Sequence, residues 1–504
     1  MENDPLNLDE KGEWAGEWWL PEAQDKKMPG VLRYDPDHGL SLTLICGFND
    51  RITSPTPSGE VGVQEGRRTW DVIRGTAEQH SITLLDCYPT KSELNGLGCL
   101  LDPDKQAIGK QTIGVGTALI GAWVSDEDEA AFSAAEVSVE ELSRWGASSI
   151  LEEKFGTTDG CPDGSGVISV DPVPGQKVSV NETTYTLKHR CTWHLRDYLR
   201  GSTVISVRDT TFVRVDPAKC CSLNDAKDFA HLVQDLIALA THRAAGVIWL
   251  RLKKSTEDAG DQQEGAGRGE SRDRNVDVIY SPSKVGSHDG KAVQSGHVLF
   301  TCKDLPFKEI IPRWCEVHER LRPALNMILG LRYAPAQYIE NNLLMVVGAA
   351  EVLHRGLRID EPPMPDKDFK PMREEMLKHV PEEHKARIKG LLRNGPTLRE
   401  RLHALADLPD QKAMSSLVPE VERWVQRTTK ARNDLAHEGQ TPNHSFEELI
   451  AIVDVTTAVV ILNLLNEVGL SAEQQRKIIR NNPQLREAAR QASDLLRSPD
   501  KREE

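Results

Sequence analysis

The stretch that decides the helical half of this chain spans residues 417–439 and reads LVPEVERWVQRTTKARNDLAHEG. With Val421 at azimuth zero and about 100° for each residue of an α-helix, several side chains share one face with it. Those within about 60° of Val421 are Leu417, Val418, Trp424, Val425, Thr428 and Leu435. Arg432 falls at about 20°, inside the same stripe. A charge there needs a partner, an interface or a cleft, because burying it unpaired would be costly.

The end of this stretch gathers three groups that suit phosphodiester cleavage. Arg432 is a permanent cation, Asn433 carries a side-chain amide, and His437 is of the residue type that titrates near neutrality. A histidine can act as base for a ribose 2′-OH or as acid for the leaving 5′-oxygen, and arginine suits the charge that builds on phosphate oxygens. The sequence therefore predicts a catalytic site without a metal or other cofactor.

The spacing of the pair raises a geometric question. On a straight helix His437 lies roughly 140° from Arg432, whereas Asn433 and His437, four residues apart, share a face. Either the helix bends or ends within the motif, or the productive pairing joins two copies of the chain. One histidine does not easily act as base and acid at once, so this chemistry favours the dimer.

A purely structural role for the same residues is the alternative. Arg432 would close a core ion pair with Glu351 or Asp454, and His437 would cap a helix end beside Gly439. For an arbitrary arginine and histidine at this spacing, the structural role is the more common one. The rest of the chain has to decide between the two interpretations.

Composition narrows the class of protein. A chain of 504 residues predicts two or three domains, and a net charge of −15 argues against a general nucleic-acid coat protein. An RNA substrate must therefore be drawn to a local basic site. Residues 1–4 open no signal peptide, and the apolar run 449–468 contains polar residues that favour a buried or interfacial helix over a membrane span. Nine scattered cysteines without a Cys-x-x-Cys pair predict a cytoplasmic protein.

The pattern of apolar residues changes along the chain from strand-like to helical. Short alternating runs separated by turn residues predict a β-rich first half, either a sandwich or an open barrel. The expected strands are 40–45, 82–85, 184–187, 204–207, 247–252, one near 276 and 297–300, with a helix over 224–245. The last domain is expected to contain four or five antiparallel helices, because capping boxes at Thr397–Glu400 and Ser445–Glu448 open apolar-periodic segments. Gly439 and Gly469 mark expected helix ends.

These patterns predict an α+β multidomain chain with a β-rich N-terminal domain followed by an all-α bundle. The predicted boundaries are a tail over 1–12, the β-rich domain over 13–305 with a flexible insert at 254–275, a connecting helix over 306–334, the helical domain over 335–470 and a charged tail over 471–504, expected to be a solvated helix.

Other constellations carry weaker signals. His189, Cys191 and His194 offer zinc ligands, but they do not share one strand face and no fourth ligand stands nearby, so no metal site is predicted. Residues 114–119 lack the third glycine of a dinucleotide fingerprint. The tryptophans at 14, 18 and 19 suit core or edge packing better than base stacking.

The motif and the all-helical segment around it resemble the HEPN superfamily, in which an arginine is followed five residues later by a histidine. The front of the chain adds a second match, to the N-terminal domain of ApeA-like anti-phage HEPN proteins. Its residues are Glu13-Trp14, Gly16 to Pro21, Pro29 to Asp35, Gly39 to Leu44, Ile73-Arg74-Gly75, Ile82 to Asp86, Phe132-Ser133 and Leu142 to Trp145. Glu340 and the segment Ala350 to His354 continue the resemblance ahead of the motif.

The resemblance implies a bacterial abortive-infection endoribonuclease. Arg432 and His437 would be the catalytic pair, with Asn433 as the polar residue that commonly follows the arginine, and with Glu351 and Asp434 in support. The expected partners are an RNA substrate, tRNA or other cellular RNA, a second copy of the chain, and a phage-derived trigger sensed by the N-terminal domain, with no membrane involved. The alternatives are a non-catalytic HEPN module that dimerises or binds RNA, and a ligand-sensing protein.

Overall fold

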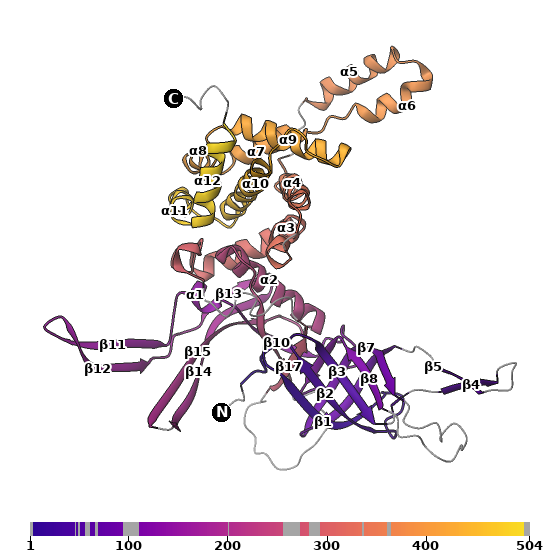
Figure 1. Cartoon of the computed structure of the whole chain (residues 1–504), viewed down its shortest axis with the longest axis vertical. Helices are drawn as coiled ribbons and strands as arrows, with labels where there is room; N and C mark the ends of the chain where they lie inside the picture. The colour runs from indigo at the N-terminus through magenta and orange to yellow at the C-terminus, as the bar shows by residue number, and fades with distance from the viewer. Residues whose placement is uncertain are drawn as a thin grey trace. The chain divides into compact units, whose positions relative to one another are not determined.

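The computed structural model of the chain describes residues 4–45, 47–48, 51–55, 61–65, 69–93, 110–199, 201–255, 273–281, 293–334, 337–359 and 364–497. They divide into two units. The first unit, Met1–Ile237 with Ala245–Lys291, is rich in strands, and the second, Ala238–Ala244 with Ala292–Glu504, is helical (Figure 1). The predicted α+β fold class is confirmed.

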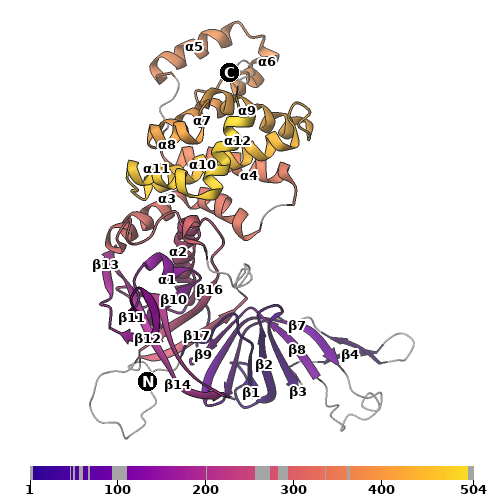
Figure 2. The ribbon, with the colours of Figure 1, turned by 60° about the vertical axis from the view of Figure 1, so that its left-hand side comes forward.

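A closed ring of antiparallel strands forms one end of the first unit, as Figure 2 shows. Around the ring the order is β7-β6-β1-β2-β3-β8, and β8 pairs back onto β7. The predicted sheet is thus neither a sandwich nor an open barrel at this end, because the long strand β7 pairs with β6 through its first half and with β8 through residues Tyr88–Glu93. The strands are β1 (Gly12–Trp19), β2 (Met28–Asp35), β3 (Gly39–Ile45), β6 (Trp70–Ala77), β7 (His80–Glu93) and β8 (Lys110–Val115).

The tryptophans of the first strand pack into this ring. Trp14, Trp18 and Trp19 are only 7%, 0% and 5% exposed, so they serve core packing and not base stacking. Gly75 makes room for Trp18, since a Cβ at this glycine would lie 2.3 Å from the indole ring. The chain ahead of β1 is bound as well, because Leu8 is buried and its backbone bonds both Ile248 and the Tyr34 hydroxyl.

From β7 the sheet continues as an open antiparallel extension in the order β9-β17-β16-β10-β15-β14-β13. Two further ribbons, β4–β5 and β11–β12, pair outside this sheet (Figure 1). The elements are β9 (Thr117–Ile120), β17 (Arg274–Tyr280), β16 (Val247–Lys254), β10 (Phe132–Val139), β15 (Ser202–Asp216), β14 (Thr183–Leu199), β13 (Gln176–Val180), β4 (Arg51–Pro55), β5 (Val61–Glu65), β11 (Leu151–Thr158), β12 (Cys161–Val170) and the helices α1 (Leu142–Gly146) and α2 (Leu223–Thr241).

The second unit is built around one apolar helix, α10. It packs against α3, α4, α7, α8, α9, α11 and α12, so the described bundle has more helices than the four or five predicted. The elements are η3 (Ser295–His297), α3 (Phe307–Tyr333), α4 (Ile339–Gly356), α5 (Asp366–Lys378), α6 (Glu382–Leu391), α7 (Leu398–Asp407), α8 (Gln411–Leu417), α9 (Val421–Glu438), α10 (Phe446–Glu467), α11 (Ala472–Asn481) and α12 (Pro483–Leu495).

Helix α10 is long and apolar enough to cross a membrane by composition. In its most apolar window 78% of the residues are nevertheless buried inside the helical unit. Its polar side chains find partners there: the Asn463 amide donates to the backbone oxygens of Leu405 and Val459. The helix is accordingly a core helix, as the polar residues in its sequence predicted.

Three local expectations are wrong, each for a tertiary reason. Residues 297–300 form no strand, because Leu299 donates its backbone N–H to Ala240 and not to a sheet. The tail over 471–504 is not a solvated helix: α11 and α12 bury Ile478, Ile479 and Leu485. At Ser445 only half of the capping box forms, because the Glu448 carboxylate pairs with Arg427. The insert at 254–275 lies mostly outside the described residues.

One buried histidine links the stability of the helical unit to pH. His242 follows α2 and is buried, with its Nε2 against the Arg332 guanidinium. Burial, followed by the charges of Arg332 and His297, holds the pKa of His242 well below its usual range. The folded chain therefore keeps the ring neutral, whereas the unfolded chain binds a proton below about pH 6.5. The stability from this group is present above that pH and is lost on acidification.

We expect His242→Gln to flatten this pH dependence, because the glutamine oxygen still accepts from Arg332 but does not titrate. The measurement is the fall in unfolding temperature between about pH 7.5 and about pH 5.5, which should be smaller in the variant than in the wild type. The exposed His384→Gln serves as the control and should fall as the wild type does. An equal fall in all three proteins would contradict the assignment.

Candidate functional site

Helix α9 carries the motif and holds it straight. One face of the helix buries Trp424, Val425, Thr428 and Ala431, and the Trp424 indole N–H donates to the Thr456 hydroxyl of α10 at 3.1 Å. The helix runs without interruption through the motif and ends at Gly439, whose φ of 71° suits glycine. A bend or an end within the motif is therefore not observed.

Arg432 lies at the edge of the packed face. Its Nη2 donates to Glu351 Oε1 of α4 at 3.3 Å, its Nη1 donates to Asn433 Oδ1 at 3.3 Å, and 35% of its side chain is exposed. The ion pair with Glu351 that the structural interpretation anticipated is thus present, but at the surface of the bundle and not in its core. Asp454 is not the partner of Arg432. Burial raises the pKa of the Asp454 carboxyl, whereas a hydrogen bond from Gln491 and the charge of Arg332 lower it.

Glu351 stands between two arginines. Its Oε1 accepts from Arg432, and its Oε2 lies 3.8 Å from Nη2 of Arg355, one turn further along α4. Sequence reasoning named Glu351 but missed Arg355, although the i, i+4 spacing is a visible signal. The arrangement places two cations beside a single carboxylate at the surface.

His437 and Asn433 face solvent on the last turns of α9. Among the residues that the structure describes, no hydrogen bond joins His437 to Arg432 or Asn433. The helix end is closed by Gly439, whose N–H donates to the Leu435 oxygen, so His437 does not cap it. Among the described residues of one copy, His437 is exposed and takes part in no hydrogen bond or ion pair.

A second set of contacts fixes the loop after the motif. The Arg427 guanidinium pairs with the Glu448 carboxylate and donates to the Asn443 backbone oxygen at 2.7 Å. Because Glu448 is engaged there, it gives only its backbone N–H to the Ser445 hydroxyl, and the predicted capping box is half made. Asp434 accepts from the Asn443 amide at 3.2 Å, which makes its support of the motif structural.

His444 lies in this loop, and sequence reasoning missed it. Its Nε2 is 3.1 Å from the Arg427 backbone oxygen. Burial, and then the charge of Arg427, lowers the pKa of His444. Its place before the cap residue Ser445 is the only signal in the sequence, and a cap neighbour is not distinctive.

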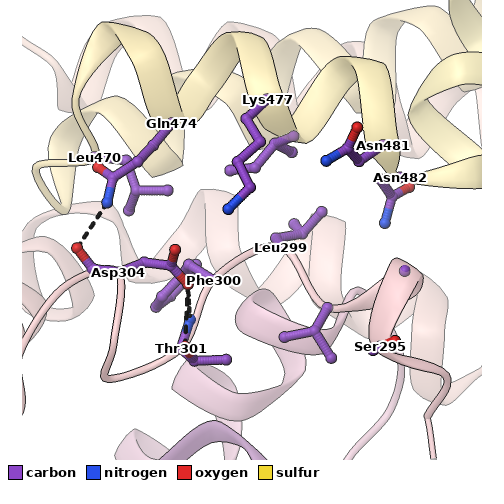
Figure 3. A pocket seen from close by; sticks show the side chains of 13 residues that line it. Ser295, Leu299, Phe300, Thr301, Asp304, Leu470, Gln474, Lys477, Asn481 and Asn482 are labelled. Atoms are coloured by element: carbon purple, nitrogen blue, oxygen red, sulfur yellow. Dashed lines mark hydrogen bonds between the residues drawn. The ribbon is translucent and has the colours of Figure 1, made fainter. Parts of the chain in front are cut away.

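A pocket of the helical unit lies apart from the motif. It has a volume of about 280 Å³ between the 295–304 segment and α11 (Figure 3). The Lys477 amino group points toward it, and Gln474 donates to the Asp304 backbone oxygen at 2.6 Å. None of the predicted site residues lines this pocket. The candidate chemistry is therefore outside this pocket.

The possible zinc ligands are described only in part, because the His194 side chain lies outside the described residues. Within the described residues no group of three His, Cys, Asp or Glu side chains is placed to hold a metal ion. His189 instead contacts Asp209 and Ser148.

Comparison with known families bears on both units. Residues 13–314 match the family model for ApeA N-terminal domain 1, and residues 344–474 match the model for the Apea-like HEPN domain. The chain is an ApeA-like HEPN protein. The HEPN match contains Glu351 and the whole motif from Arg432 to His437. This family supports an anti-phage function, and its HEPN domains are usually ribonucleases that act as dimers on RNA.

Other comparisons add little. No curated protein matches the chain. Among solved structures, the one titled pT26-6p is 8% identical, covers 97% of this chain and 93% of its own, and has a TM-score of 0.12, which is too low to indicate a shared fold.

The two ion pairs of α9 should differ in their contribution to stability. Arg432 and Glu351 are partly exposed, so Arg432→Ala should lower the free energy of unfolding by less than about 1 kcal/mol. The side chains of Arg427 and Glu448 are only 14% and 16% exposed, and Arg427→Ala leaves a largely buried carboxylate without its guanidinium, at a cost of about 2 to 3 kcal/mol. Urea unfolding measures both. Equal losses would mean that Arg432 is primarily structural.

Proposed function

We propose that this HEPN protein is a metal-independent endoribonuclease that cuts cellular RNA as a dimer during abortive infection. One observation carries the proposal: Arg432, Asn433 and His437 project from the accessible last turns of α9 inside the segment that matches the HEPN family. The partial exposure of Arg432 leaves its guanidinium within reach of a phosphate.

The chemistry follows from these groups. A neutral His437 takes the proton of the ribose 2′-OH, whose oxygen forms a bond to the adjacent phosphorus. The bond from phosphorus to the 5′-oxygen breaks, and a protonated histidine supplies the proton that this leaving oxygen needs. Arg432 stabilises the charge on the phosphate oxygens, and Asn433 donates to the phosphate or orients the histidine. The products are a 2′,3′-cyclic phosphate and a 5′-hydroxyl.

The acid and the base call for two histidines, which a second copy supplies. Apolar side chains stand exposed on α4, with Leu344 at 42% and Met345 at 36%. Leu344 precedes Glu351 by seven residues, so both lie on one face of α4, and Glu351 contacts Arg432. An exposed apolar surface beside the motif fits a symmetric interface that brings two motifs together.

We assign control of the nuclease to the N-terminal domain, with a phage-derived trigger acting on it. Phe155, Val167 and Ile168 on the β11–β12 ribbon are each more than 60% exposed and offer an apolar surface for such a trigger. The RNA target is tRNA or another cellular RNA.

A non-catalytic HEPN module is the second candidate. The Arg432–Glu351 ion pair favours it, because this contact engages the arginine without any substrate. Under that alternative, His437→Ala would keep the biological effect of the chain.

We expect Arg432→Ala and His437→Ala each to lower the rate of RNA cleavage by about 10² to 10⁴-fold, since each removes a group that acts on the reacting phosphate. The assay is cleavage of total RNA in EDTA by the full chain, with detection of the cyclic phosphate end. DNA should survive, because it lacks the attacking hydroxyl.

Two exposed residues outside the motif serve as controls. Lys430→Ala removes an exposed cation two residues before Arg432, and His384→Ala removes an exposed histidine of α6. Both should cleave at the wild-type rate. Retained cleavage in Arg432→Ala and His437→Ala together would refute the assignment.

The dimer is tested at α4. Leu344→Asp with Met345→Asp should shift the chain toward monomer in sedimentation velocity, and should reduce cleavage while leaving the unfolding temperature near the wild-type value, because both side chains are exposed. A double variant that keeps the wild-type mass and activity would place the interface elsewhere.

A further inference from the structure

A Ser–His–Asp series of hydrogen bonds lies in the first unit. None of its three residues has a role in the nuclease proposal. The Ser148 hydroxyl oxygen is 3.0 Å from His189 Nε2, and His189 Nδ1 is 2.9 Å from Asp209 Oδ1. Each ring nitrogen thus faces the partner that general-base catalysis requires, with the carboxylate on Nδ1 and the hydroxyl on Nε2. His189 is one of the three residues that the sequence offered as possible zinc ligands.

The fold brings these three residues together from distant positions. On the antiparallel pair β14–β15, His189 stands opposite Thr211 and Cys191 stands opposite Asp209, so His189 and Asp209 share one face of the ribbon. Helix α1 covers that face closely, because a Cβ on Gly146 would lie only 3.4 Å from the Leu187 side chain.

The turn after α1 returns the chain to the ribbon. Ala147 has φ of 52°, which ends the helix in the left-handed region and leads directly into Ser148. A non-glycine residue in this conformation is uncommon, and such strain recurs at functional sites.

Asp209 is held by more than the imidazole. Its Oδ2 accepts from the Ser149 hydroxyl at 3.0 Å and from the Ile150 backbone N–H at 3.1 Å. The side chains of His189 and Asp209 are only 4% and 10% exposed. Thr211 Oγ1 lies 3.5 Å from Nδ1, a weaker contact than that of the carboxylate. The carboxylate therefore fixes the ring with a proton on Nδ1 and a lone pair on Nε2.

We propose that Ser148, His189 and Asp209 form a nucleophilic triad that hydrolyses carboxylic esters, an activity separate from RNA cleavage. The hydroxyl stands at the more accessible end of this hydrogen-bonded network. Ser148 is half-buried, whereas the two groups behind it are nearly enclosed. Within the described part of the chain, the backbone N–H groups of Ser148 and Ser149 bond no other protein group, and they are thus available to a developing oxyanion.

Hydrolysis of the ester needs only these three residues and one water molecule. Ser148 Oγ forms a bond to the ester carbonyl carbon while its proton passes to His189 Nε2, and the tetrahedral oxyanion collapses with loss of the alkoxide, which takes that proton. Water then gives a proton to His189 and its oxygen to the carbonyl carbon. The bond from this carbon to Oγ breaks, and Oγ regains the proton, which releases a carboxylic acid. Asp209 stabilises the imidazolium in both halves.

The neighbouring thiol does not compete as the nucleophile. Cys191 lies on the same face of the ribbon, but burial, and then the charge of Asp209, raises the pKa of its thiol. The thiolate form is therefore scarce at neutral pH.

The test uses the full chain with a biotin-linked fluorophosphonate. The reaction forms an Oγ–phosphorus bond and breaks the phosphorus–fluorine bond, the serine proton passes to His189, and fluoride leaves. We expect peptide mapping to find the label on Ser148, and Ser148→Ala to abolish it. His189→Gln removes the base and should slow labelling at least about 100-fold. Asp209→Asn should slow labelling about 10⁴-fold, since the wrong tautomer of His189 then faces the serine.

Controls separate this activity from folding and from the nuclease. Ser143→Ala removes an exposed serine of α1 and should label as the wild type. Ser148→Ala should retain RNA cleavage, and His437→Ala should retain labelling, so either activity can fail without the other. Labelling of Ser148 no faster than in heat-denatured wild type would overturn the proposal, as would wild-type labelling in a folded His189→Gln. The wild-type mapping decides even where a variant does not fold.

Discussion

Burial of α10 is the constraint on which the helical unit depends. Fourteen of its residues are buried, on all sides of the helix, so every neighbouring helix must turn an apolar face toward it. Helix α9 meets this requirement with Trp424, whose indole N–H also satisfies Thr456 of α10. Because that face is committed to packing, the opposite side of α9 must face outward. The motif residues Asn433 and His437 are on the side that packing leaves free.

Electrostatics at the site is local and not a property of the whole chain. The net charge is −15, yet Arg432 and Arg355 converge on the one carboxylate of Glu351. A phosphate that approaches this cluster competes with an ion pair of low strength, because the pair is partly exposed. The pair holds the guanidinium in place without burying it, which suits the proposed role of Arg432 in binding a phosphate.

Predictions from the sequence were most successful for features that lie within a single helix or strand. The strand around Leu42, the helix that carries Arg432 and the glycine at its end all follow from local patterns, and they are confirmed. Helical phasing put Arg432 within the packed stripe, but the structure places it at the edge, because a long side chain reaches past its Cα to Glu351. The strand expected at 297–300 failed because an apolar run fits either a strand or a buried loop, and the backbone partner of Leu299 comes from Ala240.

The sequence by itself determined the α+β class, the helix under the motif and, through resemblance, the family, whereas the catalytic role of the motif residues stays a prediction. It did so because periodicity, caps and short motifs are written in neighbouring residues. Only the tertiary structure decided the closure of the ring through β7 and β8, the burial of α11 and α12, and the meeting of Ser148 with His189 and Asp209. The contacts of His189 with Ser148 and Asp209 join residues 41 and 20 positions apart in the chain. Strand register and packing set such pairings, and no local pattern records them.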